Sequence, residues 1–214
     1  MTWNLFRLML GGALLATALP AAARSPYAGQ YRAAVGPDTA GALDLRADGT
    51  FRYELSEGAL DEHAEGTWSE TGGDIRLDTA PKPKPPSFAR GPDNASPGAL
   101  TIQVKLADGR ELAGVDFRLG LSDGSSVAGY TQAEGWNFAE RAGRSIVWAE
   151  IYEPIYAVAS QRFAIEPPAT GGLVFLLTPN DIDTVDFVHA QLEPRSDDFV
   201  LHHPRGELRM VRQR

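Results

Sequence analysis

The chain has 214 residues, of which 43% are hydrophobic and 22% are charged, a composition typical of folded soluble proteins. It contains no cysteine, which excludes disulfide frameworks, cysteine-ligated metal clusters, thiol nucleophiles and lipid attachment through cysteine. Its formal net charge of -8 disfavours binding to polyanions, so we expect no nucleic-acid partner.

The first 23 residues have the pattern of a secretory signal peptide. Arg7 precedes an apolar run from Leu8 to Leu19, and the small residues at 21–23 supply an A-x-A cleavage signal. The alternative, an uncleaved membrane anchor, needs a longer apolar run, and no second run follows. We therefore expect a periplasmic or secreted protein that does not span the membrane.

Residues 24–80 alternate between apolar and polar side chains, as strands with one buried face do. Asp48-Gly49 is a turn signal between two such runs, and Gly72-Gly73 is another. These patterns predict β-hairpins. Residues 58–64 and 136–142 are the only stretches of the mature chain that offer a turn of helix.

Six prolines lie between residues 81 and 98, which predicts an extended linker or a surface loop. Alternation returns in 99–166 and continues in 167–214, with further Gly and Pro punctuation between them. No convincing amphipathic helix interrupts these runs. The predicted fold class is therefore all-β.

Two motifs in the middle segment carry a resemblance to a known family. They are A-D-G-R-E-L-A-G-V-D-F at 107–117 and G-Y-T-Q-A-E-G-W-N-F at 129–138. Residues 99–166 resemble the transthyretin-like, carboxypeptidase-regulatory type of β-sandwich, although Gln132 stands where that family usually has Asp. The resemblance implies an Ig-like or transthyretin-like sandwich that serves as an accessory fold rather than a catalyst.

The flanking segments resemble small bacterial lipocalin-like barrels. They carry Y-A-G-Q-Y at 27–31, D-G-T-F at 48–51 and G-T-W at 66–68, and 167–214 has a similar pattern. Strands from both ends suffice for one barrel of about eight strands, which can hold one small ligand. We therefore hypothesise one barrel interrupted by an inserted sandwich. The alternative is two domains in series, over 24–80 and 99–214.

Four aromatic residues of the middle segment are candidate ligand-binding residues, because tyrosine and tryptophan combine an apolar body with a polar tip. They are Tyr130, Trp136, Trp148 and Tyr152. The alternative interpretation places them in the core or at its rim.

Two further motifs suggest chemistry. Glu62, His63 and Glu65 supply candidate metal ligands, but the stretch is equally typical of a polar loop. Gly120 to Gly124 matches G-x-S-x-G, whose nucleophile elbow needs a strand, a turn and a helix. Here an Asp-Gly turn joins two strands, so Ser122 is interpreted as part of a hairpin tip.

These observations predict an exported, non-enzymatic β-protein that binds a small apolar or amphiphilic ligand or a cell-envelope protein, without a cofactor. The second hypothesis is a structural or accessory interaction protein with no ligand. The third is a metal-dependent or serine hydrolase. A barrel interior lined by Phe51, Tyr53, Trp68 and Phe187 with a void favours the carrier, and a filled interior favours the interaction protein.

Overall fold

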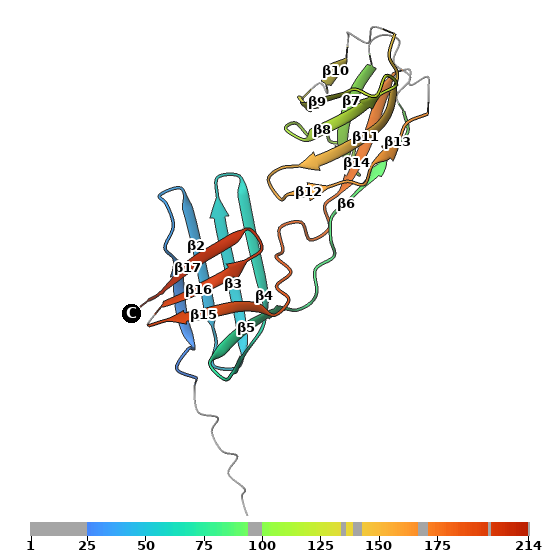
Figure 1. The fold of residues 1–214 in the computed structure, drawn as a ribbon. Coiled ribbons are helices and arrows are strands. Elements are labelled where there is room, and N and C mark those ends of the chain that lie inside the picture. The colour runs from blue at the N-terminus through green and yellow to red at the C-terminus, as the bar shows by residue number, and fades with distance from the viewer. Residues whose placement is uncertain are drawn as a thin grey trace, which may run out of the picture.

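The computed structural model describes residues 25–93, 100–133, 136–138, 143–166, 171–196 and 198–213. Figure 1 shows two lobes: a barrel built from both ends of the chain, and a second lobe built from its middle. All described elements are strands, which confirms the all-β prediction. The expected signal peptide, residues 1–23, lies outside the described residues.

Eight antiparallel strands close the barrel, and two separate segments of the chain supply them. The first segment contributes β1 (Gly29–Ala33), β2 (Thr39–Leu45), β3 (Thr50–Glu57), β4 (Leu60–Thr71) and β5 (Asp74–Thr79). The second contributes β15 (Ala190–Arg195), β16 (Asp198–His203) and β17 (Gly206–Arg212). The pairs β5–β15 and β1–β17 join the two sets, as expected for a lipocalin-like barrel built from N- and C-terminal strands.

The two-residue alternation of the sequence decides which side chains fill the barrel. Leu43 and Leu45 on β2 lie opposite Tyr53 and Phe51 on β3, and all four are at most 1% exposed. The polar residues between them face outward. Gly49 turns the chain between the strands with a φ of +82°, which glycine adopts without a steric penalty.

Two sheets form the second lobe. One has the order β10–β7–β14–β6, and the other has the order β12–β11–β8–β9, with β13 also paired to β11. The strands are β6 (Ser87–Arg90), β7 (Leu100–Leu106), β8 (Asp116–Leu121), β9 (Ser126–Tyr130), β10 (Trp136–Phe138), β11 (Ile146–Glu153), β12 (Val158–Ala159), β13 (Phe163–Ala164) and β14 (Gly172–Thr178).

The sheets of the second lobe share a single apolar core. Ile102 on β7 and Phe175 on β14 belong to the same buried cluster as Leu119 on β8 and Ile151 on β11. Each of these four side chains is at most 1% exposed. Two sheets that bury their inner faces against each other form a β-sandwich.

Two connectors, residues 80–86 and 179–189, join the lobes and are hydrogen-bonded to each other. The Lys84 amide donates to Oδ2 of Asp181 at 2.7 Å, and the Asp181 amide donates to the Lys84 carbonyl at 3.2 Å. The side-chain amide of Asn180 donates to the Pro85 carbonyl at 2.8 Å. The outgoing and returning chains therefore form one paired stalk.

The returning connector also completes the barrel. It runs parallel to β4 at His63, whose amide donates to the Asp183 carbonyl and whose carbonyl accepts from the Val185 amide, both at 2.9 Å. Val185 and Phe187 then enter the barrel core, where they are 9% and 2% exposed. Residues outside the named strands thus close part of the wall.

Three segments differ from their expected roles. Residues 60–64 belong to strand β4 rather than to a turn of helix, because Leu60, Glu62 and Ala64 alternate into the barrel. The stretch expected as a linker includes strand β6, which pairs with β14. Within 167–214, strand β14 belongs to the sandwich and β15–β17 belong to the barrel.

Candidate functional site

Aromatic side chains fill the barrel interior. Tyr53 and Phe187 meet edge to face with ring centroids 5.2 Å apart, and Phe51 lies 6.1 Å from Phe187. Trp68 closes the core and donates its indole N–H to the Arg46 carbonyl at 2.9 Å. The four side chains expected to line a lumen thus pack as a core.

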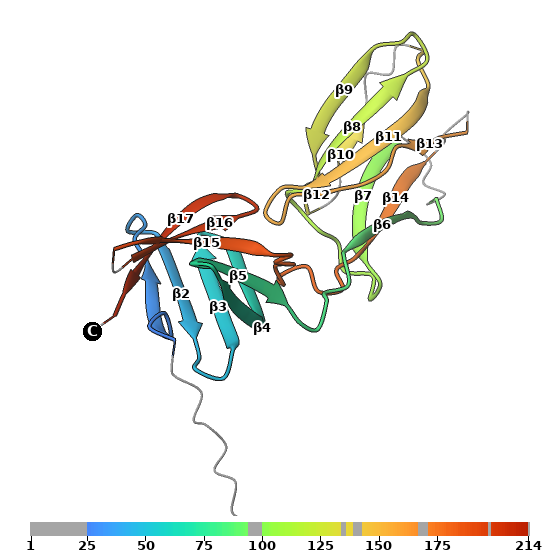
Figure 2. The ribbon, with the colours of Figure 1, turned by 60° about the horizontal axis from the view of Figure 1, so that its bottom comes forward.

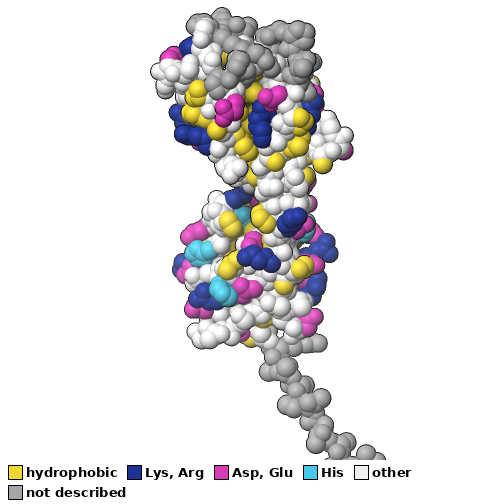
Figure 3. Space-filling model, turned by 90° about the vertical axis from the view of Figure 1, so that its right-hand side faces the viewer, with side chains coloured by type: hydrophobic (Ala, Val, Ile, Leu, Met, Phe, Trp, Pro, Cys, Tyr) yellow, Lys and Arg dark blue, Asp and Glu magenta, His cyan; other side chains and the backbone are white. Residues whose placement is uncertain are grey.

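A cavity of about 610 Å³ lies where the two lobes meet, and we call it the junction cavity. The molecular surface narrows at this position in Figure 3. Both connectors, the turn between β11 and β12 and the end of β16 form its walls. Its apolar lining includes Pro83, Pro85, Pro86, Tyr156, Val158, Ile182 and Pro204.

The wall that the sandwich contributes is held in place on both sides. The buried Glu153 carboxylate accepts hydrogen bonds from the amides of Ile155 at 3.2 Å and Tyr156 at 2.8 Å, which fixes the β11–β12 turn. The Tyr156 hydroxyl reaches the backbone of Asp61 at the start of β4. Burial is the largest cause that raises the pKa of Tyr156, and the nearby carboxylates of Asp183, Asp61 and Glu153 raise it further.

A buried ion pair lies at the base of the cavity. Glu62 on β4 accepts a hydrogen bond from Arg205 Nε at 2.7 Å, and His203 Nε2 lies 3.2 Å from its other carboxylate oxygen. The Glu62 and His203 side chains are 7% and 2% exposed, whereas Arg205 is 34% exposed. The strand alternation that buries apolar residues also buries this pair.

Electrostatics keep Glu62 ionised. Burial alone raises the pKa of its carboxyl, but the contacts with His203 and Arg205 outweigh burial and bring that pKa below its usual value. Oε2 of Glu62, Nε2 of His203 and the Tyr53 hydroxyl have no aligned hydrogen-bond partner among the described residues. Glu62 and His203 belong to the cavity lining, but these three polar atoms are enclosed by the protein rather than open to the cavity.

The contacts of His203 define its tautomer. Nδ1 accepts a hydrogen bond from the Arg205 amide at 3.1 Å, so Nδ1 carries no proton in this arrangement. The proton of a neutral ring then lies on Nε2, which faces Glu62. Nδ1 is occupied by the Arg205 amide and Nε2 is buried against Glu62, so neither nitrogen is open to a molecule in the cavity.

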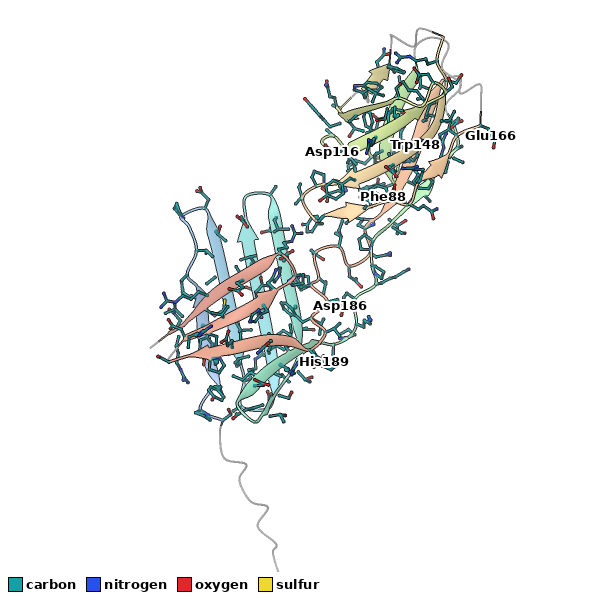
Figure 4. All side chains as sticks on the ribbon, in the orientation of Figure 1. Phe88, Asp116, Trp148, Glu166, Asp186 and His189 are labelled. Carbon is teal, nitrogen blue, oxygen red and sulfur yellow. The ribbon has the colours of Figure 1, made fainter. Side chains whose placement is uncertain are left out.

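Charges of both signs surround the cavity. Lys82 lies 3.7 Å from Asp186, which Figure 4 labels on the returning connector. Asp183 lies 3.9 Å from the His63 ring, and Asp181 accepts from a backbone amide. The rim thus mixes ammonium and carboxylate groups beside an apolar wall.

The three candidate metal ligands do not converge. Glu62 points into the barrel, whereas His63 and Glu65 point outward, because successive strand residues face opposite sides. His63 Nε2 contacts the Thr184 hydroxyl at 3.3 Å. Within the described part of the chain, no group of three His, Cys, Asp or Glu residues is arranged to hold a metal ion.

The four candidate aromatic residues divide between the two sheets. Trp148, Tyr152 and Tyr130 lie on the outer face of the β11–β8–β9 sheet, at positions that pair with Gly120 and Asp116 of β8. Figure 4 labels Trp148 and Asp116 on this sheet. Trp136 lies on β10 of the other sheet, so the structure does not join all four in one groove.

Trp136 and Trp148 are both largely occupied by the protein itself. Trp136 packs against Phe117 and Phe138 at centroid distances of 5.0 and 5.4 Å. Trp148 is covered by the Arg162 guanidinium, 4.0 Å from its ring. Tyr130 and Tyr152 remain open, at 57% and 39% exposure.

Ser122 lies in the β8–β9 turn, as the hairpin interpretation predicted. Its hydroxyl accepts a hydrogen bond from the Ser145 amide at 3.1 Å. The turn connects two strands rather than a strand and a helix, so the geometry of a nucleophile elbow is absent from these described residues.

The sequence interpretation missed His203 and Arg205. His203 continues the inward series Phe199, Leu201, and Glu62 continues the inward series Leu60, Ala64, so alternation places both in the barrel. Alternation does not show that β4 begins on the side of the barrel where β16 ends. That information comes from the closed strand order.

In the described ranges there is no helix with the length and apolar character needed to cross a bilayer. The chain matches no family model, and the comparisons with curated proteins and with solved structures found no similar protein.

Proposed function

We propose that the chain is an exported, non-enzymatic binding protein that takes a small amphiphilic molecule into the junction cavity rather than into the barrel. One observation carries this proposal. A cavity of about 610 Å³, a volume typical of small-molecule sites, combines a proline-rich apolar wall with a buried ion pair at its base.

The lining suggests the chemistry of the ligand. Pro83, Ile182 and Val158 offer an apolar surface for a hydrocarbon portion. Lys82, Asp183 and Asp186 place both signs of charge near the opening. A head group with both charges, or an uncharged polar one, suits such a rim better than a single net charge does.

The absence of catalysis is part of the proposal. The ring nitrogens of His203 are directed at the Arg205 amide and at Glu62, and Ser122 lies in a turn. Periplasmic or secreted localisation follows from the leader pattern at 1–23. The sandwich would serve as an accessory, transthyretin-like interaction module.

An interaction protein without a small ligand is the second candidate function. The filled barrel interior favours it, since Phe51, Tyr53 and Phe187 occupy the space in which a lipocalin-like carrier would hold its ligand. The junction cavity distinguishes the two functions, because only the binding protein needs it to be accessible.

The test uses the full exported chain and dodecylphosphocholine, a zwitterionic amphiphile, as the probe. Ile182→Trp fills the cavity, and Val188→Trp adds the same ring to the same connector at a side chain that is 62% exposed and outside the cavity lining. Binding is measured by calorimetry below the micellar concentration, and native mass spectrometry reports any co-purified molecule.

We expect the wild type and Val188→Trp to bind the probe and Ile182→Trp to lose binding. Equal binding by the two variants would place the site elsewhere. No binding of the probe by the wild type, together with no co-purified molecule, would favour the interaction protein.

A further inference from the structure

Strand β9 is an open edge of the sandwich. It ends the β12–β11–β8–β9 sheet, and Figure 2 shows it along the outer side of the second lobe. The barrel, in contrast, is closed and has no edge. Among the described strands, open sheet edges therefore occur only in the sandwich.

The pairing pattern shows which backbone groups of β9 have no partner among the described residues. Leu121 donates to the Ser125 carbonyl and Thr131 donates to the Val115 carbonyl, each at 2.9 Å. Hydrogen-bonded pairs alternate in an antiparallel ladder, so residues 127 and 129 also bond to β8. The N–H and C=O groups of residues 126, 128 and 130 consequently point away from the sheet.

Strand β9 lacks the features that normally protect an edge. Its sequence is S-V-A-G-Y, without charge or proline. The other described end strands of the two sheets are shorter: β12 has two residues, β10 has three, and β6 has four and includes Arg90. Five residues of uncharged, extended backbone are enough to pair with an added strand.

Beside this edge lies a carboxylate that has no partner in the described part of the chain. Asp116 on β8 is the cross-strand neighbour of Tyr130 on β9 and of Tyr152 on β11, and all three are exposed on the outer face. Asp116 has no hydrogen bond or ion pair with any described residue. Nearby Arg118 is directed toward the Ser126 hydroxyl, 3.4 Å away.

We propose that an extended peptide segment of a partner protein adds to β9 as a further strand and places a lysine or arginine opposite Tyr130. The side chain at that register position would lie on the outer face, over the Tyr130 ring and toward Asp116. It would gain a cation–π contact and a charge partner. The free groups of residues 126, 128 and 130 would supply the main-chain hydrogen bonds.

Charge complementarity favours such a partner over a second copy of this chain. A β9 strand from another copy would bring no basic residue to Asp116, because S-V-A-G-Y contains none. Each copy also carries a net charge of -8, which opposes self-association. A basic segment is attracted by the same charge.

The test titrates the isotope-labelled full chain with the peptide acetyl-Lys-Val-Thr-Val-Thr-amide and follows the amide signals by NMR. Antiparallel pairing places its lysine opposite Tyr130. A peptide with glutamate in place of lysine tests the charge, and a peptide N-methylated at the backbone groups that face β9 tests the strand pairing. We expect slowed exchange of the Ala128 and Tyr130 amides with the lysine peptide, and at least fivefold weaker binding of the other two.

Two variants and their controls localise the effect. Ala128→Pro removes an outward N–H that β8 does not use, and Ala128→Thr keeps it, so we expect only the proline variant to lose binding. Asp116→Asn preserves the strand and should abolish the preference for lysine over glutamate. It therefore tests the proposal even where the proline variant folds poorly.

Three results would overturn the proposal. Equal binding of the lysine and glutamate peptides would contradict the basic partner. Self-association that Ala128→Pro removes, without peptide binding, would make a second copy the occupant. Signal changes confined to the junction cavity would show that the peptide does not pair with β9.

Discussion

Glu62 occupies an inward position that β4 otherwise gives to apolar side chains. Leu60 and Ala64 flank it on the same face and are 7% and 1% exposed. A buried carboxylate is stable there because Arg205 and His203 lie beside it at the same end of the barrel. Removing one charged group from such a buried cluster leaves the charges of the remaining groups uncompensated.

Glu62→Gln should therefore destabilise the fold in a pH-dependent manner. At pH 7 we expect a loss of about 3 kcal/mol in the free energy of unfolding, measured by urea denaturation. The pKa of the Glu62 carboxyl is lower in the folded than in the unfolded chain, so its contribution is fully present above pH 4.5. That contribution is lost as pH falls through the folded pKa.

The control is Glu65→Gln, which removes the same charge from the outer face of β4 and should cost less than about 0.5 kcal/mol. The difference between wild type and Glu62→Gln should shrink below pH 4.5. A difference that stays constant down to pH 3 would mean that the carboxylate charge does not stabilise the barrel.

Gly120 leaves room for the indole ring of Trp148, which packs directly against its backbone. A methyl group at this position would overlap the Trp148 indole, a ring that the Arg162 guanidinium also contacts. Gly120→Ala should displace the ring, lower stability by about 2 kcal/mol and shift tryptophan fluorescence. Gly36→Ala, with nothing within 4 Å of the added carbon, should leave both unchanged.

Among the elements, the returning connector (residues 179–189) helps to close the barrel although it forms no named strand. Val185 and Phe187 fill the core on the side where β4 extends beyond β5, and Thr79 binds the backbone on both sides of Phe187. The connector therefore couples the position of the sandwich to the packing of the barrel.

Phe187→Ala should lower the stability of the barrel by about 3–4 kcal/mol, because it leaves a large cavity among rigid aromatic neighbours. Val188→Ala, one residue later on an exposed side chain, should cost less than about 0.5 kcal/mol. Thermal unfolding followed by circular dichroism measures both. A small effect of Phe187→Ala would mean that the connector leaves the barrel readily.

Alternation explains most of what the sequence predicted at this scale. Together with the turn residues, it identified the hairpin turns at Asp48-Gly49 and Gly72-Gly73 and the inward residues of β2 and β3. It did not identify the buried pair, because Glu62 and His203 are 141 positions apart and meet only after the barrel closes. The metal-site hypothesis grouped Glu62 with His63 because they are adjacent in sequence. Adjacent residues of a strand, however, point to opposite faces of the sheet.

For the whole molecule, the closed strand order has a consequence for folding. β5 pairs with β15, although more than a hundred residues separate them in the chain. The barrel therefore cannot close until the C-terminal strands have been made, and such long-range pairing is slow to form. The hydrogen-bonded stalk brings the two barrel segments within reach of each other.

Because the stalk already joins Lys84 to Asp181, the sandwich should be removable. A chain in which Asn-Gly replaces residues 85–180 keeps all eight barrel strands. Asn-Gly favours the two-residue turn that joins paired antiparallel segments, here the two connectors at Lys84 and Asp181. We expect this chain to give a strand-rich circular dichroism spectrum and a cooperative unfolding transition. Residues 25–80 alone, which lack β15–β17, should stay unfolded, because β1 and β5 would become open edges. A folded 25–80 fragment would contradict the interrupted barrel and would instead support two independent domains in series.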